Sequence, residues 1–107
     1  MGQVWTVPAT MISIVDGDTF HLNLDLGWHI SYQARVRIAH VNAPEISTPE
    51  GLAAKDWAAT QLGPGDAVTF TSRRLDKYGR PLGDLGYGLK DYGAELIEAG
   101  HGSVMNF

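Results

Sequence analysis

The sequence predicts a mainly β fold, a small five-stranded Greek-key barrel of the OB type with two helices. Three observations predict it. Period-two alternation marks three strands before residue 40, helical periodicity follows, and two further strands and a short helix complete the 107 residues. The length fits one domain spanning residues 1–107, large enough to bury a core without disulfides.

The first half predicts a three-stranded antiparallel meander. Residues 10–15 are rich in β-branched side chains and are followed by Asp16-Gly17, a common hairpin-turn pair. Residues 20–26 alternate strictly, and Gly27-Trp28 marks the next turn. In the third strand, two faces alternate: one carries Ile30, Tyr32, Ala34, Val36 and Ile38, and the other carries His29, Ser31, Gln33, Arg35 and Arg37.

The second half predicts two helices and two strands. The first helix begins near residues 47–50 and runs to about Leu62, with either Ser47 in a capping box or Thr48 as the cap before Pro49. Strands are expected at residues 67–72 and 82–87, and Asp91 caps a short helix that ends at Gly100. The predicted inward residues of the helices are Ala54, Trp57, Ala58 and Leu62, then Tyr92, Leu96 and Ala99. The three tryptophans, Trp5, Trp28 and Trp57, are interpreted as core or loop anchors.

Composition excludes several classes of function. The chain has no cysteine, which excludes disulfides, zinc-thiolate sites and thiol nucleophiles. No apolar run reaches the roughly 18 residues that a membrane span needs, so no membrane partner is expected. No signal peptide is visible, and a cytoplasmic location is the default expectation.

The positive charges are concentrated in two places. The formal net charge of −4 argues against attraction of nucleic acid over the whole surface. All but two of the eight Lys and Arg residues are Arg35, Arg37, Arg73, Arg74, Lys77 and Arg80. This clustering predicts a local phosphate site.

Three short segments carry the chemistry of such a site. Asp18 offers a hard oxygen ligand, Arg37 and Arg80 offer guanidinium forks for a phosphate, and Glu45 offers a base for water. Each has an ordinary alternative: a tight turn at residues 16–19, a solvated strand face at Arg35 and Arg37, and a surface carboxylate or charged loop for the others. Together they are the parts needed for phosphodiester hydrolysis.

These segments resemble the staphylococcal nuclease-like (thermonuclease) family. The matching stretches are Val15-Asp16-Gly17-Asp18-Thr19, Arg37 with Val41-Asn42-Ala43-Pro44-Glu45, and Asp76-Lys77-Tyr78-Gly79-Arg80-Pro81-Leu82. They occur in the family's order, and the similarity covers roughly residues 10–105.

The resemblance implies a calcium-dependent endonuclease that cleaves DNA and RNA with little sequence preference and leaves a 3′-phosphate. It implies that Arg37 and Arg80 stabilise the transition state and that Glu45 is the general base. By the same resemblance, Lys77 and Tyr78 bind a terminal phosphate of the nucleotide, and Asp18, Asn42 and the main-chain carbonyl of Ala43 bind the metal.

The chain departs from the family pattern at two points. Asn42 stands where the family usually has an aspartate, so weaker Ca²⁺ binding or a preference for Mg²⁺ or Mn²⁺ is expected. The family's third helix and its base-stacking tyrosines are not found in these 107 residues, and self-association into a homo-oligomer is one hypothesis for compensation. Two alternatives therefore stay open: an inactive OB module that binds nucleic acid or a protein, and a structural domain that ignores nucleic acid.

Overall fold

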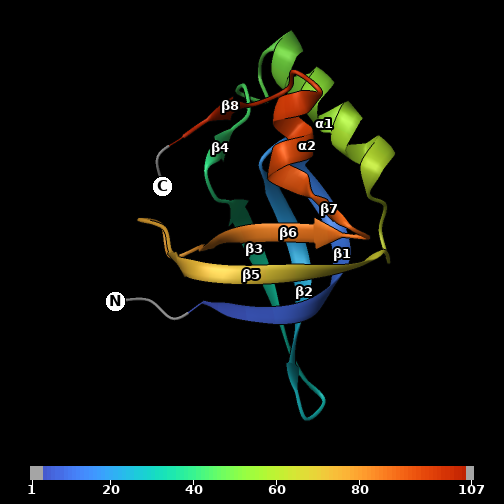
Figure 1. Cartoon of the computed structure of the whole chain (residues 1–107), viewed down its shortest axis with the longest axis vertical. Coiled ribbons are helices and arrows are strands. Elements are labelled where there is room, and N and C mark those ends of the chain that lie inside the picture. Colours follow the sequence, from blue (N-terminus) through green and yellow to red (C-terminus); the bar gives the residue numbers. More distant parts are fainter. Residues whose placement is uncertain (1–3, 106–107) are drawn as a thin grey trace.

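The computed structural model describes residues 4–105 and shows a closed barrel with two helices on one side (Figure 1). The elements in chain order are β1 (Trp5–Asp16), β2 (Thr19–Gly27), β3 (Ile30–Ile38), β4 (Val41–Asn42), α1 (Pro49–Gln61), β5 (Ala67–Leu75), β6 (Pro81–Tyr87), β7 (Lys90–Asp91), α2 (Tyr92–Glu98) and β8 (Ser103–Val104). The five long strands and two helices confirm the predicted mainly β, OB-type fold.

The barrel closes through one parallel contact. The main sheet has the order β3-β2-β1-β5-β6-β7, and its neighbours are antiparallel. β3 also pairs with β6 in parallel, with Arg37 opposite Leu82 and Ile38 opposite Gly83. This pairing removes the free edge of β3 at the end that carries Arg37.

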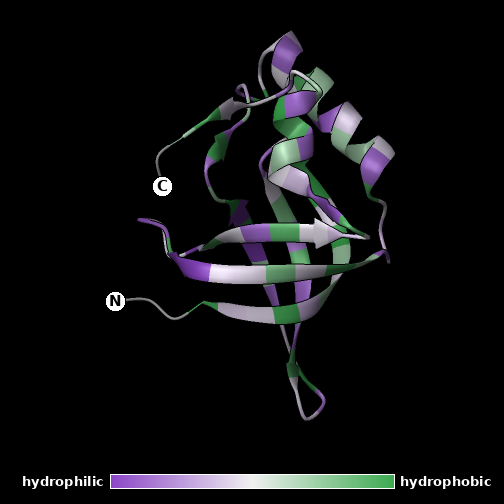
Figure 2. Cartoon of the chain, viewed as in Figure 1, coloured by the Kyte–Doolittle hydropathy of each residue, from purple (hydrophilic) through white to green (hydrophobic). Residues whose placement is uncertain are grey.

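The core combines the inner faces of the barrel strands with the buried faces of both helices. Its largest fully buried side chains include Phe20, Phe70, Met11, Leu22 and Tyr92. Apolar and polar residues alternate along the barrel strands in Figure 2, as period-two sequences require. The strands therefore form where the sequence predicts them, although β1 and β5 are longer than expected.

Helix α1 begins with the second of the two predicted caps. The Thr48 hydroxyl accepts a hydrogen bond from the Gly51 N–H at 3.0 Å, and Pro49 occupies the first turn. Ala54, Ala58 and Leu62 are buried as predicted, whereas Trp57 is only partly buried. Gly51 is required because a Cβ there would overlap the carbonyl of Glu45. The start of the helix thus fixes the backbone of the Glu45 segment.

Helix α2 is capped by Asp91 as predicted, and it ends at Glu98. Tyr92 and Leu96 are buried, but the prediction for Ala99 is wrong, because Ala99 follows the last helical residue and is exposed. None of the helices in the described part of the chain is long and apolar enough to cross a bilayer.

Two expectations about the β2–β3 hairpin are also wrong. Its turn residues are Trp28 and His29, one position later than predicted, and Trp28 is 94% exposed and anchors nothing. Ile30 and Tyr32 lie on the predicted apolar face but are each 55% exposed, because this half of β3 extends beyond the barrel. Trp5 is 55% exposed as well.

Candidate functional site

The turn between β1 and β2 places Asp18 against the segment that follows β3. The buried Asp18 carboxylate accepts hydrogen bonds from the Ala43 N–H at 2.8 Å and from the Thr19 hydroxyl at 3.0 Å. Gly17 allows this approach, since a Cβ there would lie 2.8 Å from the Ala43 Cβ. Two of the predicted segments therefore meet, and Asp18 lies in the turn itself.

Arg37 is held from several sides at the end of β3. Its Nη1 donates to the carbonyls of Ile38 at 2.6 Å and Val41 at 2.9 Å. Its Nη2 lies 3.3 Å from Asp18 Oδ2 and donates to Asn42 Oδ1, also at 3.3 Å. Arg37 is 8% exposed, so its place on the polar face of β3 does not make it a solvated side chain. Arg35, on the same face, is exposed and donates to His21.

The neighbouring carboxylate of Asp16 is electrostatically strained. Burial raises the pKa of Asp16 to about 6, and the hydrogen bond and charge of Asp18 add to the shift. Behind this turn, the buried Tyr92 hydroxyl donates to the Gly17 carbonyl at 2.5 Å. Burial, with the Asp18 charge next, raises the pKa of Tyr92. The tyrosine therefore remains a neutral donor that fixes the turn to α2.

Glu45 lies in the exposed loop between β4 and α1. Its carbonyl accepts hydrogen bonds from the Thr48 N–H at 2.9 Å and the Thr48 hydroxyl at 2.7 Å. Its side chain is exposed, and within residues 4–105 no hydrogen bond or ion pair holds the carboxylate. The main chain is thus fixed while the carboxylate stays accessible to water.

Asp76 organises the loop between β5 and β6. Its Oδ1 accepts from the N–H groups of Tyr78 and Arg80, both at 2.9 Å, and its Oδ2 accepts from Arg80 Nε at 2.7 Å. Burial alone would raise the pKa of Asp76, but the hydrogen bonds from Arg80 and Tyr78 hold it below its usual value. Gly79, with φ of 79°, supplies the left-handed turn. The motif was expected from the sequence, but this positioning role of Asp76 was not.

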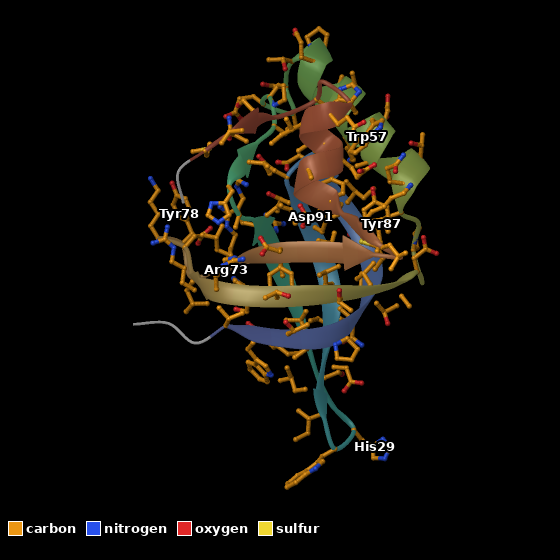
Figure 3. The ribbon with its side chains drawn as sticks, in the orientation of Figure 1. His29, Trp57, Arg73, Tyr78, Tyr87 and Asp91 are labelled. Carbon is orange, nitrogen blue, oxygen red and sulfur yellow. The ribbon has the colours of Figure 1, made fainter. Side chains whose placement is uncertain are left out.

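An open cavity of about 510 Å³ brings the cationic residues together. It is lined by Arg37, Arg74, Leu75, Asp76, Lys77, Tyr78, Arg80, Leu82 and Met105. Four predicted residues, Arg37, Arg80, Lys77 and Tyr78, thus share one cavity, while Asp18, Asn42, Ala43 and Glu45 are outside its lining. In Figure 3, Tyr78 and Arg73 lie together at one end of the sheet, and His29 marks the distant hairpin tip.

Two residues of the cavity had no predicted role. Arg74 belongs to the basic cluster that is visible in the sequence, so its charge alone could have indicated a role in the phosphate site. Met105 comes from a segment for which no prediction was made. Its N–H donates to the His40 carbonyl at 2.8 Å, beside the pairing of β8 with β4, and its sulfur lies 4.0 Å from Arg37 Nη2. Residues 106 and 107 lie outside the described part of the chain.

The sequence of this region matches a known family. Residues 35–107 match the profile described as staphylococcal nuclease homologue. The chain belongs to this family. The match includes Arg37, Asn42, Glu45 and Arg80 but begins after Asp18. The assignment of Asp18 to the candidate site therefore depends on the resemblance of its own segment and on its contacts. No curated protein matches the chain.

Proposed function

We propose that this chain is a metal-dependent endonuclease that hydrolyses phosphodiester bonds of DNA or RNA with little sequence preference. The observation that carries the proposal is the cavity in which Arg37 of β3 meets Lys77, Tyr78 and Arg80 of the distant β5–β6 loop. This cavity also lies where OB folds bind oligonucleotides, which is beside the loops that join the first two and the last two barrel strands. Membership of the family supports a nuclease.

The residues present fit a hard divalent cation such as the calcium typical of the family. Asp18 offers a carboxylate, Asn42 an amide oxygen and Ala43 a main-chain carbonyl, and calcium prefers such oxygen ligands. Arg37 Nη2 lies equally close to Asp18 Oδ2 and Asn42 Oδ1, so both oxygens already face a positive group. Within residues 4–105, no three His, Asp, Glu or Cys side chains form a metal cluster, so the candidate ligands are limited to this one carboxylate, one amide oxygen and one carbonyl. A bound cation would neutralise charge on the phosphate.

The chain's own residues supply the remaining chemistry. Glu45 accepts a proton from water and the water oxygen attacks phosphorus. The bond from phosphorus to the 5′ oxygen breaks to leave a 3′-phosphate, and the departing 5′ oxygen takes a proton from solvent to become a hydroxyl. Arg37 and Arg80 stabilise the charge that grows on the phosphoryl oxygens. Arg80 uses Nε for Asp76, and this contact orients its guanidinium at the cavity. Lys77 and Tyr78 hold a terminal phosphate.

The test compares two glutamates on the same exposed segment. Degradation of denatured DNA is measured in millimolar Ca²⁺, with EDTA as a control, for Glu45→Gln and for Glu50→Gln in the first turn of α1. Glu45→Gln should lose activity by about 10²- to 10⁴-fold, whereas Glu50→Gln should retain it. Equal activities of the two variants would remove Glu45 from the mechanism.

A second function, binding without cleavage, is favoured by two observations. Asn42 replaces a carboxylate, and neither Asp18 nor Glu45 lines the cavity. If DNA stays intact in Ca²⁺, Mg²⁺ and Mn²⁺, Asn42→Asp becomes the decisive variant. If Asn42→Asp cleaves DNA, the metal site is what the wild-type protein lacks. If this variant also leaves DNA intact, the result supports a module that binds without cleaving.

A further inference from the structure

Arg74 is a cation of the cavity that the proposed mechanism does not use. Three other arginines at this end of the barrel each have an acidic partner: Arg37 with Asp18, Arg80 with Asp76, and Arg73 with Asp84 at 2.6 Å. Within residues 4–105, Arg74 has neither an ion pair nor a hydrogen bond from its side chain. Its charge therefore faces the cavity without compensation from a carboxylate.

The strand register places Arg74 across the cavity from Arg37. Leu82 of β6 pairs with Arg37 of β3 on one side and with Arg74 of β5 on the other. Neighbouring strands are about 4.8 Å apart, so the two arginine backbones are separated by about 10 Å. All three residues line the same cavity. The arginines thus present positive charge from opposite sides of an apolar centre.

The cavity also carries an apolar surface. Leu75, Leu82 and Met105 line it together with the cations. Sites for single strands combine cations that follow the backbone with apolar or aromatic surface for the sugars and bases. A ligand with one phosphate would use only part of this arrangement.

We propose that Arg74 binds a second backbone phosphate of a single nucleic-acid strand, next to the phosphate held by Arg37 and Arg80. This inference rests on the proposed function, because it takes nucleic acid as the ligand. It assigns Arg74 to substrate binding and makes strands of several nucleotides better ligands than mononucleotides.

Adjacent Arg73 provides a matched control. Both arginines are exposed on β5 and differ by one position, but Arg73 is bound to Asp84 through Nε at 3.0 Å and Nη2 at 2.6 Å and does not line the cavity. Arg73→Gln and Arg74→Gln remove the same formal charge. A difference between them therefore reports on the cavity and not on net charge.

The experiment measures binding in EDTA, where cleavage is blocked, over a range of NaCl concentrations. The probes are a twelve-nucleotide oligothymidylate and thymidine 5′-phosphate. Arg74→Gln should weaken oligonucleotide binding by about tenfold. It should also lower the salt slope by about 0.7, the value for one phosphate of a single strand. Its binding of thymidine 5′-phosphate, and both affinities of Arg73→Gln, should stay within about twofold of wild type.

Other outcomes overturn the inference. Equal losses for both ligands would place Arg74 at the first phosphate, and equal effects of the two variants would reduce it to general charge. An oligonucleotide affinity of Arg74→Gln equal to that of the wild type would also contradict the inference. Failure of the wild-type protein to bind the oligonucleotide at low salt would instead remove the proposed function itself. Urea unfolding should show midpoints close to that of the wild type for both variants, since both side chains are exposed and the Arg73–Asp84 pair lies at the surface.

Discussion

The two walls of the candidate site achieve order in different ways. The buried wall, formed by Asp18, Arg37 and Ala43, is fixed by contacts between residues distant in sequence. The exposed wall, the loop of residues 76–80 with Arg74, is fixed almost entirely by Asp76 within the loop. Tyr78 there is 72% exposed. The arginine of the buried wall, Arg37, is therefore part of the core, whereas the arginines of the exposed wall, Arg74 and Arg80, lie at the surface.

The largest expected effect comes from breaking the buried wall. Arg37→Met should lower the free energy of unfolding by about 3–5 kcal/mol, because Asp18 would remain buried without its cation. Arg80→Met should cost less than about 1 kcal/mol, since its pair with Asp76 is partly exposed. Both variants should lose nuclease activity. Urea unfolding of the two proteins measures the difference, and similar losses of stability would show that the walls are not distinct.

Removing a support behind the buried wall should have a smaller effect. Tyr92→Phe leaves the Gly17 carbonyl without its donor, which should cost about 1–3 kcal/mol of unfolding free energy. Tyr87→Phe, whose hydroxyl donates to Gln61 at a part-buried position, is the comparison. The midpoint of thermal unfolding should fall more for Tyr92→Phe than for Tyr87→Phe. The reverse order would show that the hydrogen bond from Tyr92 does not support the turn that carries Gly17.

The pH dependence of stability should come from the same wall. Because the pKa of Asp16 is raised to about 6 in the fold, the folded state holds a proton that the unfolded state releases near pH 4. Stability in EDTA should therefore fall as pH rises from about 4 to 6 and then level off. The carboxylate is partly exposed, so the loss should be only about 1 kcal/mol. Asp16→Asn should abolish this fall, and a slope unchanged in that variant would assign it to another group.

The smallest effect on the site is expected at the far end of β3. Trp28 and His29 adopt φ values of 55° and 63°, which type I′ turns require and which Asn-Gly adopts most easily. Replacing both by Trp28→Asn and His29→Gly should raise the free energy of unfolding by about 1 kcal/mol, because bulky residues are strained there. Oligonucleotide affinity should not change. A loss of affinity would show that the hairpin tip contributes to binding.

The alternation of side chains was sufficient to predict the barrel, but not which positions the barrel covers. Ile30 and Ile38 have the same place in the pattern, yet one lies outside the barrel and the other is buried. Arg35 and Arg37 likewise share a face, and only Arg37 meets the parallel pairing with β6. That pairing joins distant segments, and nothing local in either strand encodes it.

The candidate site shows the same division. The sequence assigned the motifs around Asp18 and Asn42 to one site. In the structure the hydrogen bond from the Ala43 N–H to the Asp18 carboxylate joins these two motifs. The role of Asp76 and the approach of Met105 depend on atomic contacts that residue types do not reveal. Arg74 was visible as a charge, but its position in the cavity depends on the register of β5 with β6.

The parallel pairing of β3 with β6 also has a kinetic consequence. Residues 37 and 82 lie far apart in the chain, so this pairing pays a large loop-closure entropy and is expected to form late in folding. The Ala39 N–H donates to the Gly83 carbonyl at 2.7 Å and marks this closure. Because Arg37 and Arg80 flank it, a ligand that bridges them binds only the closed barrel. Such a ligand should slow amide exchange at Ala39 in proportion to its affinity.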